Sequence, residues 1–422
     1  MSTLPEGYRI SPVTADDLPR FRHVLELGFG FTGDPDTVAT IPFSIAYDRA
    51  VAVERPDGEY AAIHGSYEFT MPVPGGAVPC SGLTWVSTRP DERRRGLLNA
   101  MIDAHFERSL GRGEPVSALY AAEPAIYGRF GYGSAADDVR LTLPRRAALR
   151  DVPGSAALTV RLDTIDAARH DDLVHSLHAA ASAHRPGAVT RSTPELRARF
   201  LADPPAWRNG AEAQRLLSVH TAEGEPRGYA LFRRKEDWGP AGPQNKVTVE
   251  EVAALDAAAA HRLWGALLDL DLTGTVESPM LPVDDPLLQL LVEPRRATPR
   301  LTDNVWVRLL DLPAALEARR YSAPVDVVLD VTDARLPSNA GRWRLTTRDH
   351  DATTGWAASV SRTDDDADVA LDVRELGAAY LGGRSLEAYA RAGLLEERTP
   401  GAVAQTAAAF GWAVAPGCSW VF

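Results

Sequence analysis

Apolar positions follow two spacings along the chain, and these spacings predict where strands and helices lie. In the first third, alternating or continuous apolar runs predict strands over residues 47–53, 60–71, 82–87 and 116–120, with Gly65 interrupting the second. A capped helix is expected over residues 16–28, and apolar residues three and four apart predict another helix directly after Gly96. Strands and helices mixed in this order indicate an α+β or α/β layered domain.

Two further units follow. The pattern lapses near residues 143–154, which predicts a linker. Beyond it we expect a helix over 167–183, a strand–turn–strand over 216–233, a strand over 246–255 and a helix over 256–270. In the third unit the apolar pattern predicts strands over 325–331, 342–347, 357–361 and 369–373, and helices over 373–381, 385–392 and 402–410. The chain is therefore divided into residues 1–145, 146–300 and 301–422.

The most informative segment is the passage from the strand over residues 82–87 into the next helix. The first-turn N–H groups of a helix lack intrahelical partners and carry partial positive charge, so such a turn attracts anions. Gly96 lets backbone approach a phosphate, and Arg93, Arg94 and Arg95 add fixed cations. The loop itself contains neither a Gly-x-Gly-x-x-Gly fingerprint nor a P-loop. By itself it is either an anion cradle or a solvated Arg-rich turn.

A second segment, from Ser117 to Gly133, favours the anion cradle. It consists of a buried strand, a turn carrying Tyr127, and the run Ile-Tyr-Gly-Arg-Phe-Gly-Tyr-Gly that begins at Ile126. Together the two segments resemble the acetyl-CoA-binding core of the Gcn5-related N-acetyltransferases (GNAT), and more narrowly the enhanced intracellular survival (Eis) acetyltransferases of actinobacteria. Chain length, the three-part layout, the segment Asp303-Asn-Val-Trp-Val-Arg and an aromatic last residue extend the resemblance over the whole chain.

The resemblance implies a fold and an activity. The fold is α+β, with two tandem GNAT-like domains (1–145 and 146–300) followed by a sterol-carrier-protein-like domain (301–422). The second domain shows no arginine–glycine loop, so we expect it to bind no CoA of its own. The implied activity is acetyl-CoA-dependent acetylation of primary amines, either aminoglycosides or lysine side chains, by a homohexamer. The alternatives are a non-catalytic acyl-CoA-binding regulator and, through the C-terminal domain, a carrier of apolar ligands.

The site for the acetyl donor, acetyl-CoA, is expected along the strand before the arginine–glycine loop and at the start of the helix after it. The resemblance places pantetheine along the strand that precedes the loop, where backbone N–H groups would also polarise the thioester carbonyl. Leu98 stands where the usual GNAT pattern ends in Gly or Ala, a departure that the Eis group shares. The predicted CoA-binding residues are Val86, Ser87, Thr88, Arg93, Arg94, Arg95, Gly96, Leu97, Leu98, Asn99, Ala122 and Glu123.

Two residues are expected to transfer protons. A phenol with a pKa of about 10 stays protonated at neutral pH, and the resemblance makes Tyr127 the general acid. Tyr127 could instead be a buried tyrosine with a structural hydrogen bond. The resemblance also makes the terminal carboxylate of Phe422 the general base. Chain ends usually fray, but residues 412–422 are apolar and uncharged, so we expect this end to pack.

The acceptor site is less clearly marked. Glu26, Asp34, Asp36 and Asp303 are candidate substrate-binding carboxylates, and Phe29, Phe31 and Trp420 are candidate walls for cation–π contact. The penultimate residue is Val421 rather than an acid, which argues against tight binding of polycations. His175 and His178 lie three residues apart on a predicted helix, and we expect them to have no carboxylate or cysteine partners. They are interpreted as surface or core residues rather than as ligands or bases.

Charge and cysteine content narrow the remaining classes. A net charge of -12 argues against nucleic acid or an anionic membrane as a partner. Two cysteines, Cys80 and Cys418, are too few for a metal cluster, and we expect no metal cofactor. The first 22 residues lack the apolar stretch of a signal peptide, and no apolar run approaches the roughly 20 residues of a membrane span. A cytoplasmic protein is expected.

Overall fold

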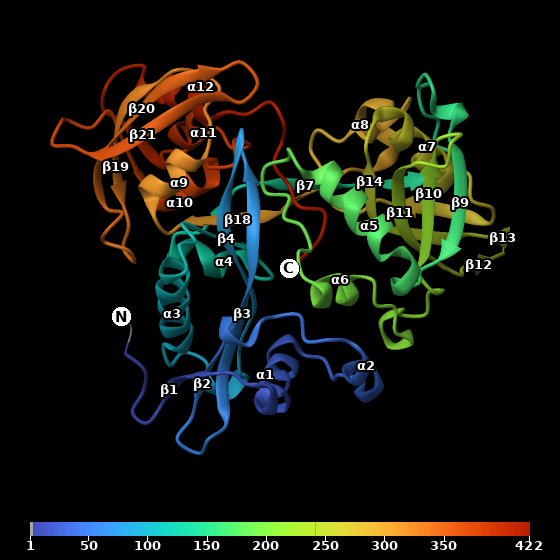
Figure 1. Ribbon diagram of the computed structural model, residues 1–422, viewed down its shortest axis with the longest axis horizontal. Coiled ribbons are helices and arrows are strands. Elements are labelled where there is room, and N and C mark those ends of the chain that lie inside the picture. The colour runs from blue at the N-terminus through green and yellow to red at the C-terminus, as the bar shows by residue number, and fades with distance from the viewer. Residues whose placement is uncertain (1–2, 241) are drawn as a thin grey trace.

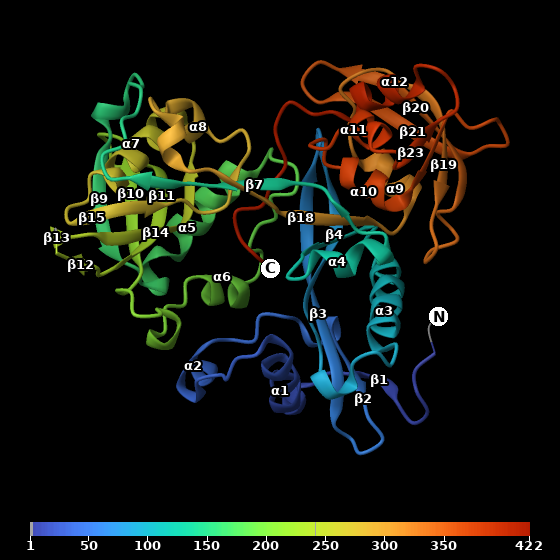
Figure 2. The ribbon, with the colours of Figure 1, turned by 180° about the vertical axis from the view of Figure 1, so that it is seen from behind.

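The computed structural model describes residues 3–240 and 242–422, which form three domains that each contain a large sheet (Figure 1). The first domain is drawn in blue and teal, the second in green and yellow, and the third in orange and red. Both views place the C-terminus between the first two domains, beside α6 (Figures 1 and 2). Sheets and helices in every domain confirm the predicted α+β class.

The first domain is a seven-stranded sheet with four helices. Its strand order is β1 (Arg9–Pro12), β2 (Ala50–Glu54), β3 (Tyr60–Val73), β4 (Gly76–Thr88), β5 (Val116–Tyr120), β18 (Val305–Leu309) and β6 (Gly133–Ser134). The helices are α1 (Leu18–Phe29), α2 (Pro35–Thr40), α3 (Leu97–Gly111) and α4 (Pro124–Tyr127). In the outer half of β3, buried Phe69 and Met71 alternate with exposed Glu68 and Thr70, the period of a half-buried strand.

The second domain is a six-stranded sheet. Its order is β8 (Thr142–Pro144), β15 (Thr273–Glu277), β14 (Asn245–Ala254), β11 (Pro226–Lys235), β10 (Arg215–His220) and β9 (Thr159–Thr164). Its helices are α5 (Ala167–Ser182), α6 (Pro194–Phe200), α7 (Ala257–Leu268) and α8 (Pro286–Leu290). Two small sheets accompany it: β16 (Leu281–Pro282), β7 (Asp137–Arg140) and β17 (Arg300–Asp303) form one, and β12 (Trp238–Gly239) and β13 (Gly242–Pro243) form the other.

The third domain is a five-stranded sheet with four helices. Its order is β21 (Gly355–Arg362), β20 (Gly341–Asp351), β19 (Asp326–Thr332), β22 (Val369–Asp372) and β23 (Leu395–Glu397). The helices are α9 (Leu312–Ala318), α10 (Val373–Ala379), α11 (Leu386–Arg391) and α12 (Ala402–Phe410). Every strand and helix predicted for this unit is present, with ends shifted by a few residues.

Three details differ from the sequence predictions. Residues Tyr47–Arg49 form a 3₁₀ turn, and the strand predicted from residue 47 begins only at Ala50. The predicted linker begins inside β8, which pairs with β15. Strand β18 lies in the first sheet, between β5 and β6, although its residues fall within the predicted third unit. Short strands whose partners are distant in sequence account for the last two differences.

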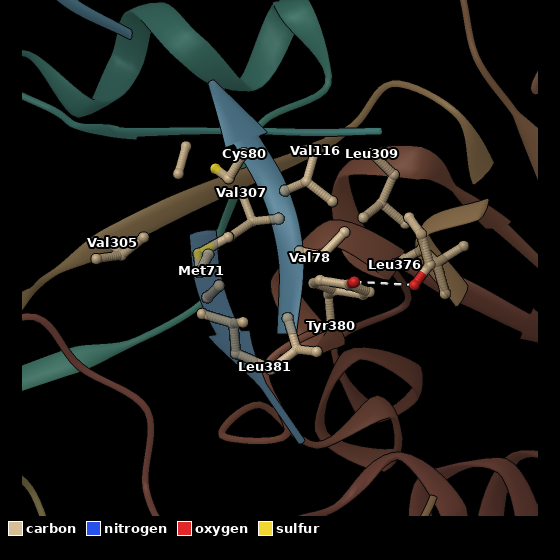
Figure 3. Packing of buried hydrophobic residues seen from close by; sticks show 14 of the residues in the cluster. Met71, Val78, Cys80, Val116, Val305, Val307, Leu309, Leu376, Tyr380 and Leu381 are labelled. Atoms are coloured by element: carbon tan, nitrogen blue, oxygen red, sulfur yellow. Dashed lines mark hydrogen bonds between the residues drawn. The ribbon is translucent and has the colours of Figure 1, made fainter. Parts of the chain in front are cut away.

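One hydrophobic core joins the first and third domains. The loop between β3 and β4 reaches the third domain, where side chains from both domains pack together (Figure 3). The buried residues that meet there include Met71, Val78, Cys80, Val307, Leu376, Tyr380 and Leu381. The Tyr380 hydroxyl donates to the Ala315 carbonyl at 2.8 Å. This shared core fixes the third domain, and the chain end that leaves it, relative to the first sheet.

Candidate active site

The site begins where β4 and β5 separate. The two strands pair in parallel only from Cys80 and Val116 to Leu83 and Leu119, and β4 then continues to Thr88 paired only with β3 on its other edge. A bulge leaves Trp85 and Val86 facing the single residue His64 of β3, and Trp85 takes a positive φ of 53°. The β5-facing edge of β4 beyond Leu83 is therefore open, forming a wedge in which an extended ligand could pair as an added strand.

The side chains of the predicted pantetheine strand are not equally available. Ser87 is buried, and its Oγ donates to the Val24 carbonyl of α1 at 2.9 Å. Gly28 makes this packing possible, because a Cβ at this position would lie 1.8 Å from Ser87 Oγ. Only the backbone of Ser87 could therefore bind a ligand, as the prediction for this strand requires.

The arginine–glycine loop has the geometry of an anion cradle. Gly96 takes a φ of 80° directly before α3, and no heavy atom lies within 4 Å of the position that its Cβ would occupy. No side chain caps the N-terminus of the 15-residue helix α3. Arg93 and Arg94 are exposed, whereas Arg95 donates to the Tyr8 hydroxyl at 2.9 Å and lies 3.2 Å from Glu92. This open, cationic helix start fits a pyrophosphate.

The other predicted residues of this loop contribute in different ways. Leu97 is buried in the core beneath the helix start, while Leu98 is partly buried. Asn99 Oδ1 accepts a hydrogen bond from Arg335 of the third domain at 2.8 Å. On the opposite side of the wedge, Ala122 lines the cavity described below, and Glu123 precedes α4.

Tyr127 ends the short helix α4, with its ring against Tyr132 at a centroid distance of 6.0 Å. It is 9% exposed, and its hydroxyl makes no hydrogen bond to any residue in the described ranges. Burial, reinforced by Glu123, raises the pKa of Tyr127 to about 12. Tyr120, by contrast, is tied to Asn304, Asp138 and Met280. Tyr127 thus has a protonated hydroxyl that is free to donate, and Tyr120 does not.

The chain end packs beside the wedge. Phe422 is 7% exposed, and its ring contacts Phe69 and Trp420 at centroid distances of 5.0 and 5.7 Å. Tyr127 and Phe422 line one cavity of about 480 Å³ together with Val86, Ala122 and Trp420. With Phe29, which lines the same cavity, the structure brings together six of the predicted site residues from the first domain and the chain end.

A second cavity of about 470 Å³ adjoins the first through shared walls, Trp85, Arg199 and Trp207. Glu26 and Asp34 line it, as does Phe31, whereas Phe29 lines the first cavity. Both carboxylates already accept backbone hydrogen bonds, Glu26 from Gly33 at 3.0 Å and Asp34 from Thr37 at 2.8 Å.

Two predicted substrate residues lie elsewhere. Asp36 is exposed on α2 and lines neither cavity. Asp303 belongs to β17, where it accepts a hydrogen bond from the Trp306 indole at 2.6 Å, and it also lines neither cavity. The structure therefore does not bring these two predicted substrate-binding residues to either cavity.

Sequence reasoning missed the contribution of the second domain to these cavities. Helix α6 and the turn after it supply Leu196, Arg199, Phe200 and Trp207. The Arg199 guanidinium lies 5.1 Å from the ring centre of Trp85 and 5.6 Å from that of Trp207. Burial lowers the pKa of Arg199, although a guanidinium remains charged. No motif marks these residues, because their role depends on docking between two domains.

Protein-family models match three successive parts of the chain. A model described as an acetyltransferase (GNAT) domain matches residues 9–135, and another with the same description matches residues 187–309. A sterol carrier protein domain model matches residues 312–419. The N-acetyltransferase Eis of Mycobacterium tuberculosis is 31% identical over 410 residues, which cover 94% of this chain and 95% of that protein. The chain belongs to the Eis family of N-acetyltransferases.

Other relatives agree with Eis membership. The crystal structure of Eis1 from Mycobacterium abscessus superposes with a TM-score of 0.80 at 29% identity, covering 98% of this chain and all (100%) of that one. An uncharacterized N-acetyltransferase of Streptomyces avermitilis is 41% identical over 370 residues, 87% of this chain and 88% of that protein. A GCN5-related N-acetyltransferase from Anabaena variabilis, at 19% identity, shares the fold with a TM-score of 0.82 and coverage of 98% and 100%.

Eis membership confirms the family, the order of domains and the enzyme class that the sequence predicts: two GNAT domains, a sterol-carrier domain and an N-acetyltransferase activity. Within residues 3–240 and 242–422, no group of three or more His, Cys, Asp or Glu side chains is arranged to hold a metal ion. In the same ranges, no helix has the length and apolar character needed to cross a membrane. The roles assigned to single residues remain predictions.

Proposed function

We propose that this Eis-family enzyme transfers the acetyl group of acetyl-CoA to a primary amine, with Tyr127 as general acid and the Phe422 carboxylate as general base. The proposal rests mainly on one observation: an unbonded tyrosine hydroxyl and the chain end line a single cavity at the open end of the β4–β5 wedge. The anion cradle at Gly96 lies at the end of the same strand, beyond the wedge.

The donor would lie along the open edge of β4. The backbone of Val86, Ser87 and Thr88 would pair with pantetheine, and their N–H groups would polarise the thioester carbonyl. Arg93, Arg94 and the N–H groups at the start of α3 would hold the pyrophosphate, with Arg95 held beside them by Tyr8. Leu97, Leu98 and Asn99 form the first turn that presents those N–H groups.

The proton transfers follow from the protonation states of the Phe422 carboxylate and the Tyr127 hydroxyl. The amine nitrogen attacks the thioester carbonyl carbon, a C–N bond forms, and the oxyanion faces the backbone N–H groups of β4. Phe422 takes the proton that the nitrogen loses, and Tyr127 gives its proton to the sulfur as the C–S bond breaks. A Tyr127 pKa of about 12 keeps this hydroxyl protonated at neutral pH.

The charges around the second cavity favour lysine-type acceptors over polycationic aminoglycosides. Arg22 and Arg199 line it, and neither forms an ion pair with a carboxylate in the described part of the chain. Glu26 and Asp34 offset part of this positive charge, but each carboxylate already accepts a backbone hydrogen bond and has less capacity left for a substrate ammonium. A single amine can reach the first cavity without placing further positive charge beside the arginines, whereas a polycation cannot.

A thiol-release assay with acetyl-CoA and a panel of amines tests the proposal. We expect turnover with lysine peptides, and weaker turnover with kanamycin and polyamines. Binding of acetyl-CoA by calorimetry without turnover on any amine would instead support a non-catalytic acyl-CoA-binding regulator. The resemblance further leads us to propose a cytoplasmic homohexamer, for which light scattering should give six times the chain mass of 45.6 kDa.

A further inference from the structure

The second domain repeats the open wedge of the first domain but not its anion cradle. Strand β14 pairs in parallel with β15 only over Asn245–Thr248 and then continues to Ala254 paired only with β11 on its other edge, with a bulge at Glu250. Only Leu255 and Asp256 separate β14 from α7, and the Asp256 carboxylate caps that helix by accepting from the Ala259 N–H at 2.8 Å. A carboxylate at the helix start repels phosphate, so this wedge is not a second CoA site.

Residues 417–419, just before the chain end, lie along this wedge. A cavity of about 320 Å³ lies between the open end of β14 and residues 417–419. Backbone groups of Cys418 bond to the Asn304 side chain, the N–H to Oδ1 at 2.8 Å and the carbonyl to Nδ2 at 3.1 Å. Ser419 Oγ donates to Oε1 of Glu251 on β14 at 2.8 Å. The tail is thus bound through specific polar contacts as well as apolar packing.

Glu251 is itself held in a fully buried charge network. Arg191 donates to both of its carboxylate oxygens at 3.0 Å, and His178 Nδ1 lies 3.3 Å away. Burial would raise the pKa of Glu251, but Arg191 and His178 outweigh it and hold that pKa well below its usual range. His175 and His178 are both buried, as one of the two interpretations of the sequence has it. The expectation that they lack carboxylate partners is wrong, because His178 faces Glu251 and His175 Nε2 lies 3.5 Å from Asp171.

The same arginine also supports the next tail residue. The Arg191 guanidinium lies 3.6 Å from the Phe200 ring centre and 5.6 Å from that of Trp420. The Trp420 indole donates to the Val189 carbonyl at 2.9 Å. Val421 is 60% exposed and holds nothing in place, so the contacts of residues 418–420, together with the packing of the Phe422 ring on Phe69, determine where Phe422 enters the cavity.

We propose that the wedge of the second GNAT domain is a receptor for the chain end, and that Glu251, oriented by Arg191, is the positioning residue that places Phe422. In the first domain the wedge is open to the acetyl donor; in the second, residues 417–419 form one wall of the cavity at its open end. The expected effect on turnover rests on the proposed function of Phe422. The binding of the chain end to the second domain does not depend on that function.

Carboxypeptidase A digestion of the native enzyme, followed by mass spectrometry, tests the holding directly. Ser419→Ala removes the tail's bond to Glu251 and leaves the Arg191–Glu251 pair intact. We expect Phe422 to be released about tenfold faster than from the wild type, the factor for losing one hydrogen bond to a charged group. Ser419→Thr should restore the wild-type rate. Ser322→Ala, which loses a 2.6 Å bond to Ala408 in the third domain, is the matched control.

Kinetics separate this inference from the proposed function. Ser419→Ala should lower kcat and leave the KM for acetyl-CoA unchanged, because the donor loop is untouched, and Ser419→Thr should rescue it. Faster digestion with unchanged kcat would uphold the receptor and refute Phe422 as the base. Equal digestion rates for Ser419→Ala and the wild type would overturn the receptor, whatever the turnover.

Discussion

Replacing Tyr127 by phenylalanine separates chemistry from folding, because the lost hydroxyl makes no hydrogen bond within the described residues. The ring packing against Tyr132 is retained. Tyr132→Phe is the opposite case: its hydroxyl lies 2.8 Å from Ser117 Oγ, which in turn lies 2.8 Å from His105 Nε2 inside the core. One substitution removes a proposed proton donor, and the other removes a structural hydrogen bond.

The two variants should respond in opposite ways. A positioned general acid contributes a factor of about 10² to 10⁴, so Tyr127→Phe should raise the barrier by about 3–5 kcal/mol and leave stability unchanged. Tyr132→Phe leaves a buried hydroxyl of Ser117 with one partner fewer and should lower the free energy of unfolding by about 1–3 kcal/mol. Its kcat should stay near the wild-type value.

Thiol release at saturating acetyl-CoA and amine measures kcat, and urea unfolding followed by tryptophan fluorescence measures stability. Both assays are run at pH 7.5 on the same preparations. If Tyr127→Phe keeps wild-type kcat, the hydroxyl is not the acid. If Tyr132→Phe loses turnover while remaining folded, the acid has been assigned to the wrong tyrosine of this segment.

Three other predictions concern the chain end, pH and acceptor charge. Adding one glycine after Phe422 should lower kcat about 100-fold, with acetyl-CoA affinity by calorimetry unchanged; full turnover would remove the terminal carboxylate from the mechanism. Burial lowers the pKa of His64 to about 3 and of His175 to about 4. Below pH 6.5 these two histidines are therefore protonated in the unfolded chain while they stay neutral in the native state. Stability should therefore be full above pH 6.5 and fall as the pH drops towards 4, by up to about 1.4 kcal/mol per pH unit for each histidine. Urea midpoints that stay constant between pH 7.5 and 5 would contradict this. Arg199→Gln should lower the KM for polycationic amines relative to lysine peptides, and equal shifts for both would show that this charge does not select the acceptor.

Local patterns predicted the strand, loop and helix on which the donor site is proposed. The strand, arginine loop and helix lie within one continuous segment, and Tyr127 lies in a motif whose spacing is local. The apolar, uncharged tail correctly indicated a packed chain end.

The residues around the proposed amine-binding cavities could not be predicted from local sequence patterns. Arg199 and Trp207 reach the cavity only because α6 docks against the first sheet. Glu251 meets His178 and Ser419 across three segments that are far apart in sequence. Candidate carboxylates chosen by position alone included Asp303, whose side chain bonds Trp306 instead. Residues that act through domain docking leave no periodic or local signal.

The place of β18 has a consequence for how the protein is made. Val305–Leu309 pair with β5 on one edge, and Trp306 and Val307 pair with β6 on the other, so the first sheet is incomplete without them. At a synthesis rate of about 5–20 residues per second, roughly 10–40 s pass between the emergence of β5 and that of β18 from the ribosome. During that interval β5 presents an unpaired edge, while the whole second domain is being translated. A fragment that ends before residue 305 would retain this edge permanently and should aggregate. The first domain is thus a unit of structure but not of synthesis.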